Sequence, residues 1–342
     1  MKIRGIGCSM PERVVTNSEI LQELMELSDP FLYDGQKEKV KSTVNALFRL
    51  SGSRDRRRRN NGDRAYDYAH RAVQQALEQA HMKPADIDLL IYVGVGRGWV
   101  EPGMATFFLH KFGMSNATGF DLLDACLSWM RALHVSYHFI KNGAYKNIMV
   151  LNAEFNYEYH GPIKNPDEVA YRFAQLTIGE SATATILSAG EPGIDPYFEF
   201  KTDPSQHDLC KIPLPNIASY SDAEKCPQLD PLVFFAYSAE LFNAANEMIP
   251  ALYFSSPELQ RRHCDIAFAH SASKSIIDNL ARQLNFGDKV VNLFPEFGNT
   301  VSASIPTAIC WALDNGLLKR DMEMMMFMGS AGFSVGICHM VY

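Results

Sequence analysis

The stretch that decides the fold is residues 119–154, which read GFDLLDACL (119–127), SWMRALHVSYHFIKNG (128–143) and, after two residues, KNIMVLNAE (146–154). The first and third pieces are short apolar runs typical of buried strands. The second piece repeats its apolar residues at helical spacing and ends at a glycine. Strand, helix and strand in this order form a βαβ unit with parallel strands. The sequence therefore predicts an α/β protein built on a parallel sheet.

The second half of the chain repeats this arrangement. The matching pieces are KVVNLFPEFGN (289–299), TVSASIPTAICWALDNG (300–316) and MEMMMFMGSAG (322–332), and ELQRRHCDIAFAH (258–270) mirrors PADIDLLIYVGVG (84–96). Repetition on this scale indicates two similar structural units. We interpret the chain as two pseudo-twofold-related α/β halves, residues 1–190 and residues 191–342.

The region before the first repeated unit contains helical patterns and a basic segment. Residues 17–50 predict two helices, and residues 65–82 predict a third, amphipathic one. Between them, SGSRDRRRRNNGD (51–63) carries loop residues and dense positive charge. Two interpretations stand: a solvated loop, or a site for the phosphates of coenzyme A or for an acidic carrier protein. The arginines concerned are Arg54, Arg56, Arg57, Arg58 and Arg59.

Composition excludes several classes of protein. The 342 residues are 47% hydrophobic and 21% charged, which is typical of globular proteins, and the net charge of −7 argues against nucleic-acid binding. The seven cysteines are scattered without a CxxC pair, so we expect neither a disulfide framework nor a zinc site. No signal peptide or apolar run of membrane-spanning length is visible. We expect a cytoplasmic protein without a metal or other cofactor.

Three residues at strand ends are candidates for chemistry. Cys126 and Asn299 occupy equivalent turns of the two repeated units, and His270 ends another predicted strand. Ligands of α/β sheets bind at the carboxyl ends of strands, so these residues are expected to meet. A cysteine at a helix start is predicted to have a lowered thiol pKa, which suits thioester exchange. Each residue also has an ordinary structural interpretation, and the hypothesis rests on their joint occurrence.

The motifs around these residues resemble a known family. They are ACLSW (125–129), AHSASKSI (269–276), FGNTVSASIP (297–306) and GSAGFSVG (329–336), with further likeness at residues 3–19, 86–96 and 176–187. In kind and order they resemble the thiolase superfamily, in particular the β-ketoacyl-ACP synthase III branch. This resemblance implies a five-layered αβαβα fold, a homodimer and a buried Cys–His–Asn site reached by a pantetheine tunnel.

The resemblance also implies roles for individual residues. Cys126 would accept an acyl group from coenzyme A or an acyl carrier protein, and His270 and Asn299 would stabilise an enolate by hydrogen bonds. The backbone N–H groups of Cys126 and Ala331 would form the oxyanion hole, with alanine where the family usually has glycine. Trp129 either narrows the acyl pocket or packs its helix onto the sheet.

A departure from the family pattern lies in VEPGMATFFLHKFG (100–113). Glu101 stands where fatty-acid-initiating synthases have phenylalanine. In this respect the chain resembles the subgroup that joins two acyl chains head to head, namely olefin-pathway, pyrone-forming and dialkyl-dione-forming enzymes. The likeness implies that Glu101 of the neighbouring subunit removes an α-proton; the alternative is an exposed loop carboxylate. Substrate specificity is expected in residues 156–175.

These observations predict a ketosynthase. A Claisen condensation would join the acyl group on Cys126 to a second acyl or β-ketoacyl thioester, in the biosynthesis of a specialised metabolite such as a pyrone, dione or ketone. Two enzymatic alternatives remain: decarboxylative condensation with malonyl-ACP, and acyl transfer to a hydroxyl or amine. A third alternative, from another class, is a non-catalytic partner subunit of a ketosynthase dimer.

Overall fold

A five-stranded sheet forms the first half of the fold. The computed structural model describes residues 1–342 apart from 157–159, 192–194, 221–229 and 271. In spatial order the strands are β1 (Lys2–Ser9), β7 (Ser181–Ser188), β6 (Ile148–Glu154), β4 (Leu89–Val93) and β5 (Thr118–Leu122). Strands β5, β4 and β6 are parallel, as the βαβ pattern predicts, whereas β7 is antiparallel to both of its neighbours. The sheet is therefore mixed rather than purely parallel.

A second five-stranded sheet follows the same plan. Its strands are β12 (Val290–Val291), β11 (Ile266–Ala269), β13 (Glu323–Ser330), β14 (Ser334–Val341) and β8 (Tyr197–Thr202). Again three strands are parallel and β14 is antiparallel to both of its neighbours. All strands of the first sheet come from residues 2–188 and all strands of the second from residues 197–341.

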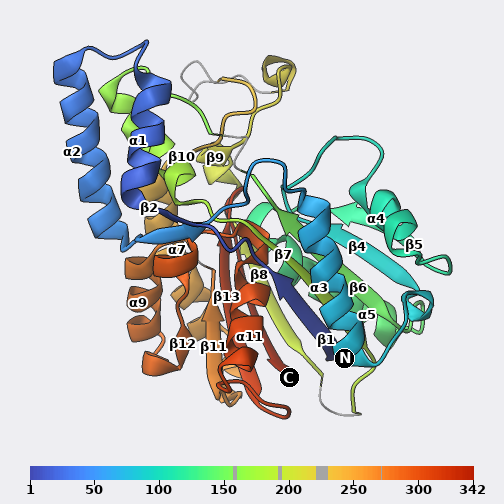
Figure 1. The fold of residues 1–342 in the computed structure, drawn as a ribbon. Coiled ribbons are helices and arrows are strands. Elements are labelled where there is room, and N and C mark those ends of the chain that lie inside the picture. Colours follow the sequence, from blue (N-terminus) through green and yellow to red (C-terminus); the bar gives the residue numbers. More distant parts are fainter. Residues whose placement is uncertain (157–159, 192–194, 221–229, 271) are drawn as a thin grey trace.

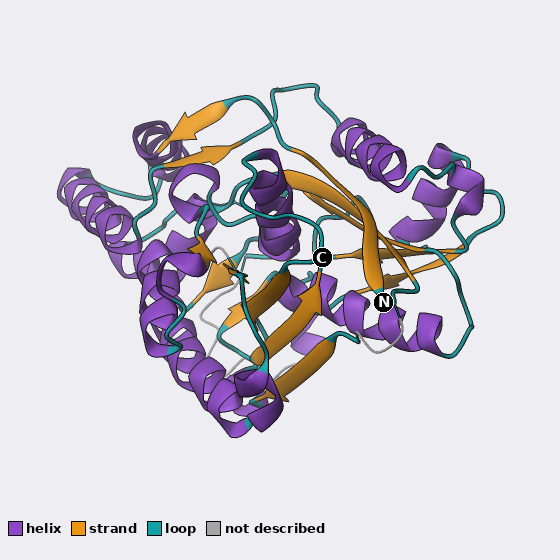
Figure 2. Cartoon of the chain, turned by 90° about the horizontal axis from the view of Figure 1, so that it is seen from below, coloured by secondary structure: helices purple, strands orange, loops and turns teal. Residues whose placement is uncertain are grey.

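Helices complete the layers around the two sheets (Figures 1 and 2). Between the sheets lie α5 (Ser128–Lys141) and α11 (Ser304–Asp314). The outer face of the first sheet packs against α3 (Ala65–Ala80) and α4 (Met104–Phe112), and that of the second against α7 (Ser238–Ser255), α8 (Pro257–Arg261) and α9 (Lys274–Gln283). This five-layered α/β arrangement confirms the predicted fold class.

The methionine-rich strand β13 shows why strands in this fold are apolar throughout. Met324, Met326 and Met328 pack into the central layer, whereas Met325 and Phe327 face the outer helices. Successive side chains of a strand point to opposite faces, and helices cover both faces of this sheet. A continuous apolar run is therefore required here, and flexible methionine side chains fill both cores.

The remaining helices and short strands lie outside the two five-stranded sheets. The predicted helix pair is present as α1 (Asn17–Ser28) and α2 (Asp34–Ser51), which stand side by side in Figure 1. The short elements are β2 (Val14–Thr16), β3 (Asp55–Arg57), β9 (Cys210–Lys211), β10 (Phe235–Ala236), α6 (Val169–Arg172) and α10 (Phe294–Phe297). Two 3-10 helices, η2 (Ala125–Leu127) and η9 (Val301–Ala303), precede α5 and α11. None of the helices in the described part of the chain is both long and apolar enough to cross a membrane.

Candidate active site

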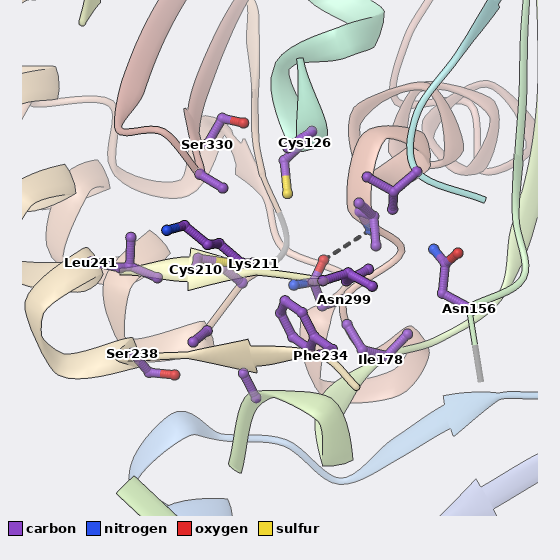
Figure 3. Close-up of a pocket in the computed structure, with 18 of the residues that line it drawn as sticks. Cys126, Asn156, Ile178, Cys210, Lys211, Phe234, Ser238, Leu241, Asn299 and Ser330 are labelled. Atoms are coloured by element: carbon purple, nitrogen blue, oxygen red, sulfur yellow. Dashed lines mark hydrogen bonds between the residues drawn. The ribbon is translucent and has the colours of Figure 1, made fainter. Parts of the chain in front are cut away.

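A cavity of about 1100 Å³ lies where the two halves meet, at the carboxyl ends of the parallel strands. Cys126, His270 and Asn299 all line it, together with Ala331 from the turn between β13 and β14. Figure 3 shows the Cys126 thiol pointing toward the side chain of Asn299. The structure thus brings Cys126 together with His270 and Asn299, which follow it by 144 and 173 positions in the sequence.

Cys126 lies in η2, on the turn that leads from β5 into α5. Ser330 of the opposite half holds this turn: its Oγ accepts a hydrogen bond from Leu127 N at 3.2 Å and donates one to Asp124 O at 2.9 Å. One hydroxyl therefore satisfies a donor before the helix and an acceptor of the preceding loop. The position of the thiol depends on a contact between the two halves.

The acidity of Cys126 differs from the sequence-based prediction. Burial raises the pKa of this thiol well above its ordinary value, and the nearby Cys210 thiol and Glu154 carboxyl act in the same direction. The prediction of a lowered pKa at a helix start was wrong, because desolvation disfavours the thiolate more than the local backbone favours it. A nucleophilic role for Cys126 therefore requires that bound substrate or a proton acceptor assist loss of the thiol proton.

His270 follows β11, which lies between β12 and β13 in the second sheet. Its backbone N–H donates to Phe327 O at 3.0 Å, and its Nδ1 lies 2.8 Å from Ser304 Oγ at the start of α11. Burial lowers the pKa of His270 to about 4, so the ring is neutral near pH 7. When the Ser304 hydroxyl donates to Nδ1, Nε2 carries the hydrogen and is a donor.

Asn299 lies in the turn between α10 and η9. Its backbone N–H donates to Thr177 O at 2.8 Å, and its carbonyl accepts from Gly179 N at 3.0 Å. The side-chain Oδ1 accepts from Val301 N at 2.9 Å. Because the oxygen is used inside the turn, the amide NH₂ is the part of this side chain that can donate to a bound molecule.

Glu101 and Trp129 lie outside the cavity of their own chain. Glu101 is exposed, on a loop whose residues Trp99 and Val100 border the cavity. Trp129 is fully buried in the central layer, where its Nε1 donates to Thr185 Oγ1 at 3.1 Å. Of the two roles predicted for Trp129, the pocket role is therefore corrected and packing is the one observed: its indole packs α5 against the first sheet.

Two of the five arginines proposed to bind a carrier are internal. Arg56 is fully buried and donates to Val15 O at 3.2 Å, and Arg58 is 4% exposed and pairs with Glu23 at 2.6 Å. Buried guanidinium groups in such pairs cannot reach a phosphate on the surface. The basic segment is not a solvated loop either, because it contains β3, which pairs with β2. For these two residues the predicted role is corrected.

The other three arginines also have partners within the chain. Arg54 is exposed and pairs with Glu296 at 2.8 Å. Arg57, which is half-buried, donates to Glu12 O at 2.9 Å. Arg59 lies 3.8 Å from the buried carboxylate of Glu180. The contacts of this segment thus mainly link the amino-terminal helices to the rest of the protein.

Several cavity residues escaped the sequence analysis. Cys210 of β9 adds a second thiol to the cavity, and burial raises the pKa of this thiol to about 12. Within the stretch expected to set specificity, the cavity residues are Asn156, His160, Phe173 and Ala174, whereas 157–159 lie outside the described residues. Further walls come from residues 210–220 and 232–249, which carry no catalytic motif. No sequence pattern pointed to these walls.

Comparison with known proteins places this geometry in a class. The family described as 3-oxoacyl-[acyl-carrier-protein (ACP)] synthase III matches residues 120–204, and its C-terminal counterpart matches residues 255–342. Beta-ketoacyl-[acyl-carrier-protein] synthase III 1 of Vibrio parahaemolyticus is 26% identical over 340 residues, covering 98% of this chain and 97% of that protein.

Two solved structures share the fold over nearly their whole length. A 3-oxoacyl-[acyl-carrier-protein] synthase III from Aquifex aeolicus is 24% identical, with a TM-score of 0.80 and coverage of 100% of this chain and 99% of the other. Xanthomonas campestris OleA, crystallised with lauric acid and lauroyl-CoA, is 19% identical, with a TM-score of 0.81 and coverage of 99% and 98%. The fold is that of the thiolase-like enzymes. Within this class, the chain is a β-ketoacyl-ACP synthase III-like condensing enzyme and therefore an acyltransferase.

Proposed function

We propose that the enzyme joins two acyl thioesters by a Claisen condensation at the cavity shared by its two halves. In the first half-reaction, Cys126 Sγ attacks the carbonyl carbon of an acyl thioester, and the carrier leaves as its free thiol. In the second, the enolate of another acyl or β-ketoacyl thioester attacks the acyl carbon, and Cys126 leaves as thiolate. The observation that carries this proposal is that Cys126, His270 and Asn299 line one cavity.

The polar groups of the cavity suit these two steps. The N–H groups of Cys126 and Ala331 would hold the oxyanion of acyl transfer to and from sulfur. Neutral His270 and the Asn299 amide would each donate to the thioester oxygen of the second substrate, where negative charge develops as the enolate forms. Both donors are oriented by hydrogen bonds within the protein, which lowers the cost of positioning them.

The rest of the cavity suits acyl chains. Its walls include Val95, Phe173, Leu241, Ile249 and Phe333, all apolar. Each methylene group removed from water contributes about 0.8 kcal/mol to binding. Acyl-CoA and acyl carrier protein are the carriers we propose for such chains, without a further cofactor. The specific product, a pyrone, dione or ketone of specialised metabolism, follows in the proposal from the resemblance at Glu101.

A homodimer is part of the proposal. Strand β5 has only one neighbour in its sheet, and Phe120 on it is 38% exposed. On the way to the cavity, Val100 and Leu123 are 69% and 61% exposed. An uncovered strand edge beside exposed apolar residues is typical of an interface. A second copy on this face would bring its Glu101 toward the neighbouring cavity, where that carboxylate would remove the α-proton of the second substrate.

The first test is intact-protein mass spectrometry after mixing wild type and Cys126→Ala with acyl-CoAs and acyl carrier proteins of different chain lengths. We expect a mass increase of one acyl group in the wild type and none in the variant, because the thioester forms on Sγ. The chain length that reacts fastest identifies the first substrate. An absence of adduct with every donor would contradict the proposal and favour the non-catalytic subunit.

The role of Glu101 is tested with mixed dimers. Glu101→Gln should still be acylated on Cys126 but should lose about 100-fold or more in condensation, since a general base contributes about 10²–10⁴-fold. If Glu101 acts on the neighbouring cavity, co-expressed Glu101→Gln and Cys126→Ala subunits will regain activity, because one cavity of the heterodimer is intact. Activity of Glu101→Gln equal to that of the wild type would contradict proton abstraction by Glu101.

The exposure of Glu101 in its own chain favours a second candidate, decarboxylative condensation with malonyl-ACP. Loss of CO₂ would then generate the enolate, and no carboxylate base would be required. In that case Glu101→Gln would condense acyl groups with malonyl-ACP at the wild-type rate and would release one CO₂ for each product formed.

A further inference from the structure

A buried carboxylate, Glu154, lies behind the cavity at the end of β6. It is fully buried and accepts hydrogen bonds from three separate segments. Its Oε2 accepts from Gly96 N and from Asn156 Nδ2, both at 2.8 Å. Its Oε1 accepts from Val95 N and Ser302 N, both at 3.3 Å, and from Ser302 Oγ.

The pattern of partners fits an ionised carboxylate. All five partners are neutral donors, and an ionised carboxylate is an acceptor on both oxygens. A protonated acid would have to turn one O–H toward groups that themselves donate. Burial raises the pKa of Glu154, and the hydrogen bonds from Ser302, Asn156 and Gly96 act in the opposite direction. Burial is the largest of these effects, so the pKa of Glu154 is raised on balance, and the five donated hydrogen bonds are the observation on which the role of Glu154 rests.

The backbone around Glu154 is shaped to admit it. Gly94, which follows β4, has φ +98°, and a Cβ there would lie 2.1 Å from Glu154 Oε1 and 2.4 Å from Ser302 Oγ. No side chain fits at this position. The GVG sequence at 94–96 wraps its N–H groups around the carboxylate, in the way that glycine-rich turns bind anions.

The same carboxylate reaches the Asn299 turn of the other half. Ser302 lies three residues after Asn299, and its Oγ also accepts from Asn152 Nδ2 at 2.8 Å. Between them, Val301 has φ +52°, an uncommon conformation for a β-branched residue. This is the residue whose N–H binds Asn299 Oδ1. A turn with such a backbone persists when its surroundings hold it, and Glu154 Oε1 accepts two hydrogen bonds from Ser302, one from the backbone N–H and one from the hydroxyl.

We infer that Glu154 is a positioning residue that fixes the Asn299 turn to the end of β4 and so holds the Asn299 amide in place for the second half-reaction. The inference rests on the proposed function, because it assigns Glu154 to condensation and not to acylation. Glu154 does not line the cavity and would not touch substrate. Its effect on the reaction would pass through Ser302, Val301 and Asn299.

The test separates the two half-reactions in Glu154→Gln. Glutamine has nearly the same shape but turns an NH₂ toward groups that donate, so the Asn299 turn should shift. We expect acylation of Cys126 within threefold of the wild type and condensation reduced about tenfold or more. Because both act on one group, Glu154→Gln should add little to Asn299→Ala: the double variant should condense within about twofold of Asn299→Ala alone.

Two further variants keep the test decisive. Ser302→Ala keeps the Ser302 N–H contact to Glu154 and removes the hydroxyl with its hydrogen bonds to Glu154 and Asn152. It should lower condensation about threefold with normal acylation, which covers the case in which Glu154→Gln does not fold. Glu199→Gln is the control: this half-buried carboxylate lies on β8, and its Oε1 accepts from Tyr197 Oη at 2.6 Å and from Ser256 Oγ at 3.1 Å, away from the cavity. It should leave both half-reactions unchanged.

A second readout follows the charge itself. The Glu154 carboxylate helps to raise the pKa of the Cys126 thiol, so its removal should lower the pH of half-maximal alkylation of Cys126 by iodoacetamide. A purely structural role would not move this pH in that direction. Equal losses of acylation and condensation in Glu154→Gln, or additive losses with Asn299→Ala, would overturn the inference. If the wild type itself shows no acylation, the proposed function fails, and the inference falls with it.

Discussion

The two turns that carry Cys126 and Asn299 occupy equivalent places in the two halves but are held in different ways. Ser330 holds the Cys126 turn through backbone contacts to Leu127 and Asp124, while the thiol points into the cavity. The Asn299 turn binds its own side chain through Val301 N and is tied to the first half through Thr177 and Glu154. Thus hydrogen bonds to the backbone hold the Cys126 turn, whereas a hydrogen bond to the side chain itself orients the Asn299 amide.

The difference matches the demands of the two chemical steps. A thiol that forms and breaks a covalent bond must reach several positions, so fixing its backbone is sufficient. A hydrogen-bond donor that stabilises developing charge must be held in one direction before the charge appears. In both cases the contact that holds the turn comes from the opposite half. Neither half contains a complete site.

Of the variants at these turns, Asn299→Ala should have the strongest effect on condensation. It removes a pre-oriented donor, and loss of one such donor costs about 10²–10³-fold in rate. Condensation should fall by about 100-fold while acylation of Cys126 stays within threefold. Quench-flow of the two half-reactions, with mass spectrometry of the acyl-enzyme, measures both. An equal loss in acylation would mean that Asn299 serves the nucleophile as well.

His270 differs from both turns, because the hydrogen bond that holds its ring comes from Ser304 of its own half. A pH experiment tests its surroundings. Since the pKa falls from about 6.5 in the unfolded chain to about 4 in the folded protein, the unfolded chain binds the proton first as the pH drops. His270 should therefore cost about 2 kcal/mol of stability between pH 7 and pH 5. Urea unfolding at both pH values should show a smaller loss for His270→Asn. An equal loss in the variant would contradict the lowered pKa.

The smallest expected effect is that of Ser330→Ala on the Cys126 turn. The change removes one of the two acceptors of Leu127 N, the other being Asp124 O, and also removes the hydroxyl that donates to Asp124 O. It should lower the free energy of unfolding by about 1 kcal/mol and slow acylation a few-fold. Ser334→Ala is the control, because its hydroxyl bonds Thr202 Oγ1 at 2.7 Å, away from Cys126. Thermal unfolding and the acylation rate measure the pair. Equal acylation rates in the two variants would show that the turn does not need Ser330.

Much of the fold could be predicted from local patterns. The βαβ unit at 119–154 and its counterpart in the second half predicted the two sheets and the helices between them. The periodicity of apolar residues reflects which faces of a helix or strand are covered, so it can be recognised from the sequence alone. The antiparallel neighbours β1, β7, β8 and β14 were not predicted, since strand direction depends on connections and not on the residues within a strand.

The candidate site was predictable only in part. Cys126, His270 and Asn299 stand next to turn residues at strand ends, so their meeting could be inferred from topology. The Cys126 pKa, the burial of Arg56 and Arg58, and the choice between the two roles of Trp129 could not, because each depends on neighbours from distant parts of the chain. Glu154 escaped notice for the same reason: three of its four hydrogen-bonded partner residues, Val95, Gly96 and Ser302, lie 58 or more positions away in the sequence.

By itself, the sequence determined the α/β class, the twofold repetition and the set of side chains able to carry out thioester chemistry, since these follow from periodicity and from the nature of the side chains. Only the tertiary structure decided which of those groups are charged, buried or oriented. Desolvation and hydrogen-bond direction are properties of the packed surroundings. In this protein the surroundings of Cys126 and of Asn299 include the opposite half of the chain, as Ser330 beside Cys126 and Glu154 beyond Asn299 illustrate.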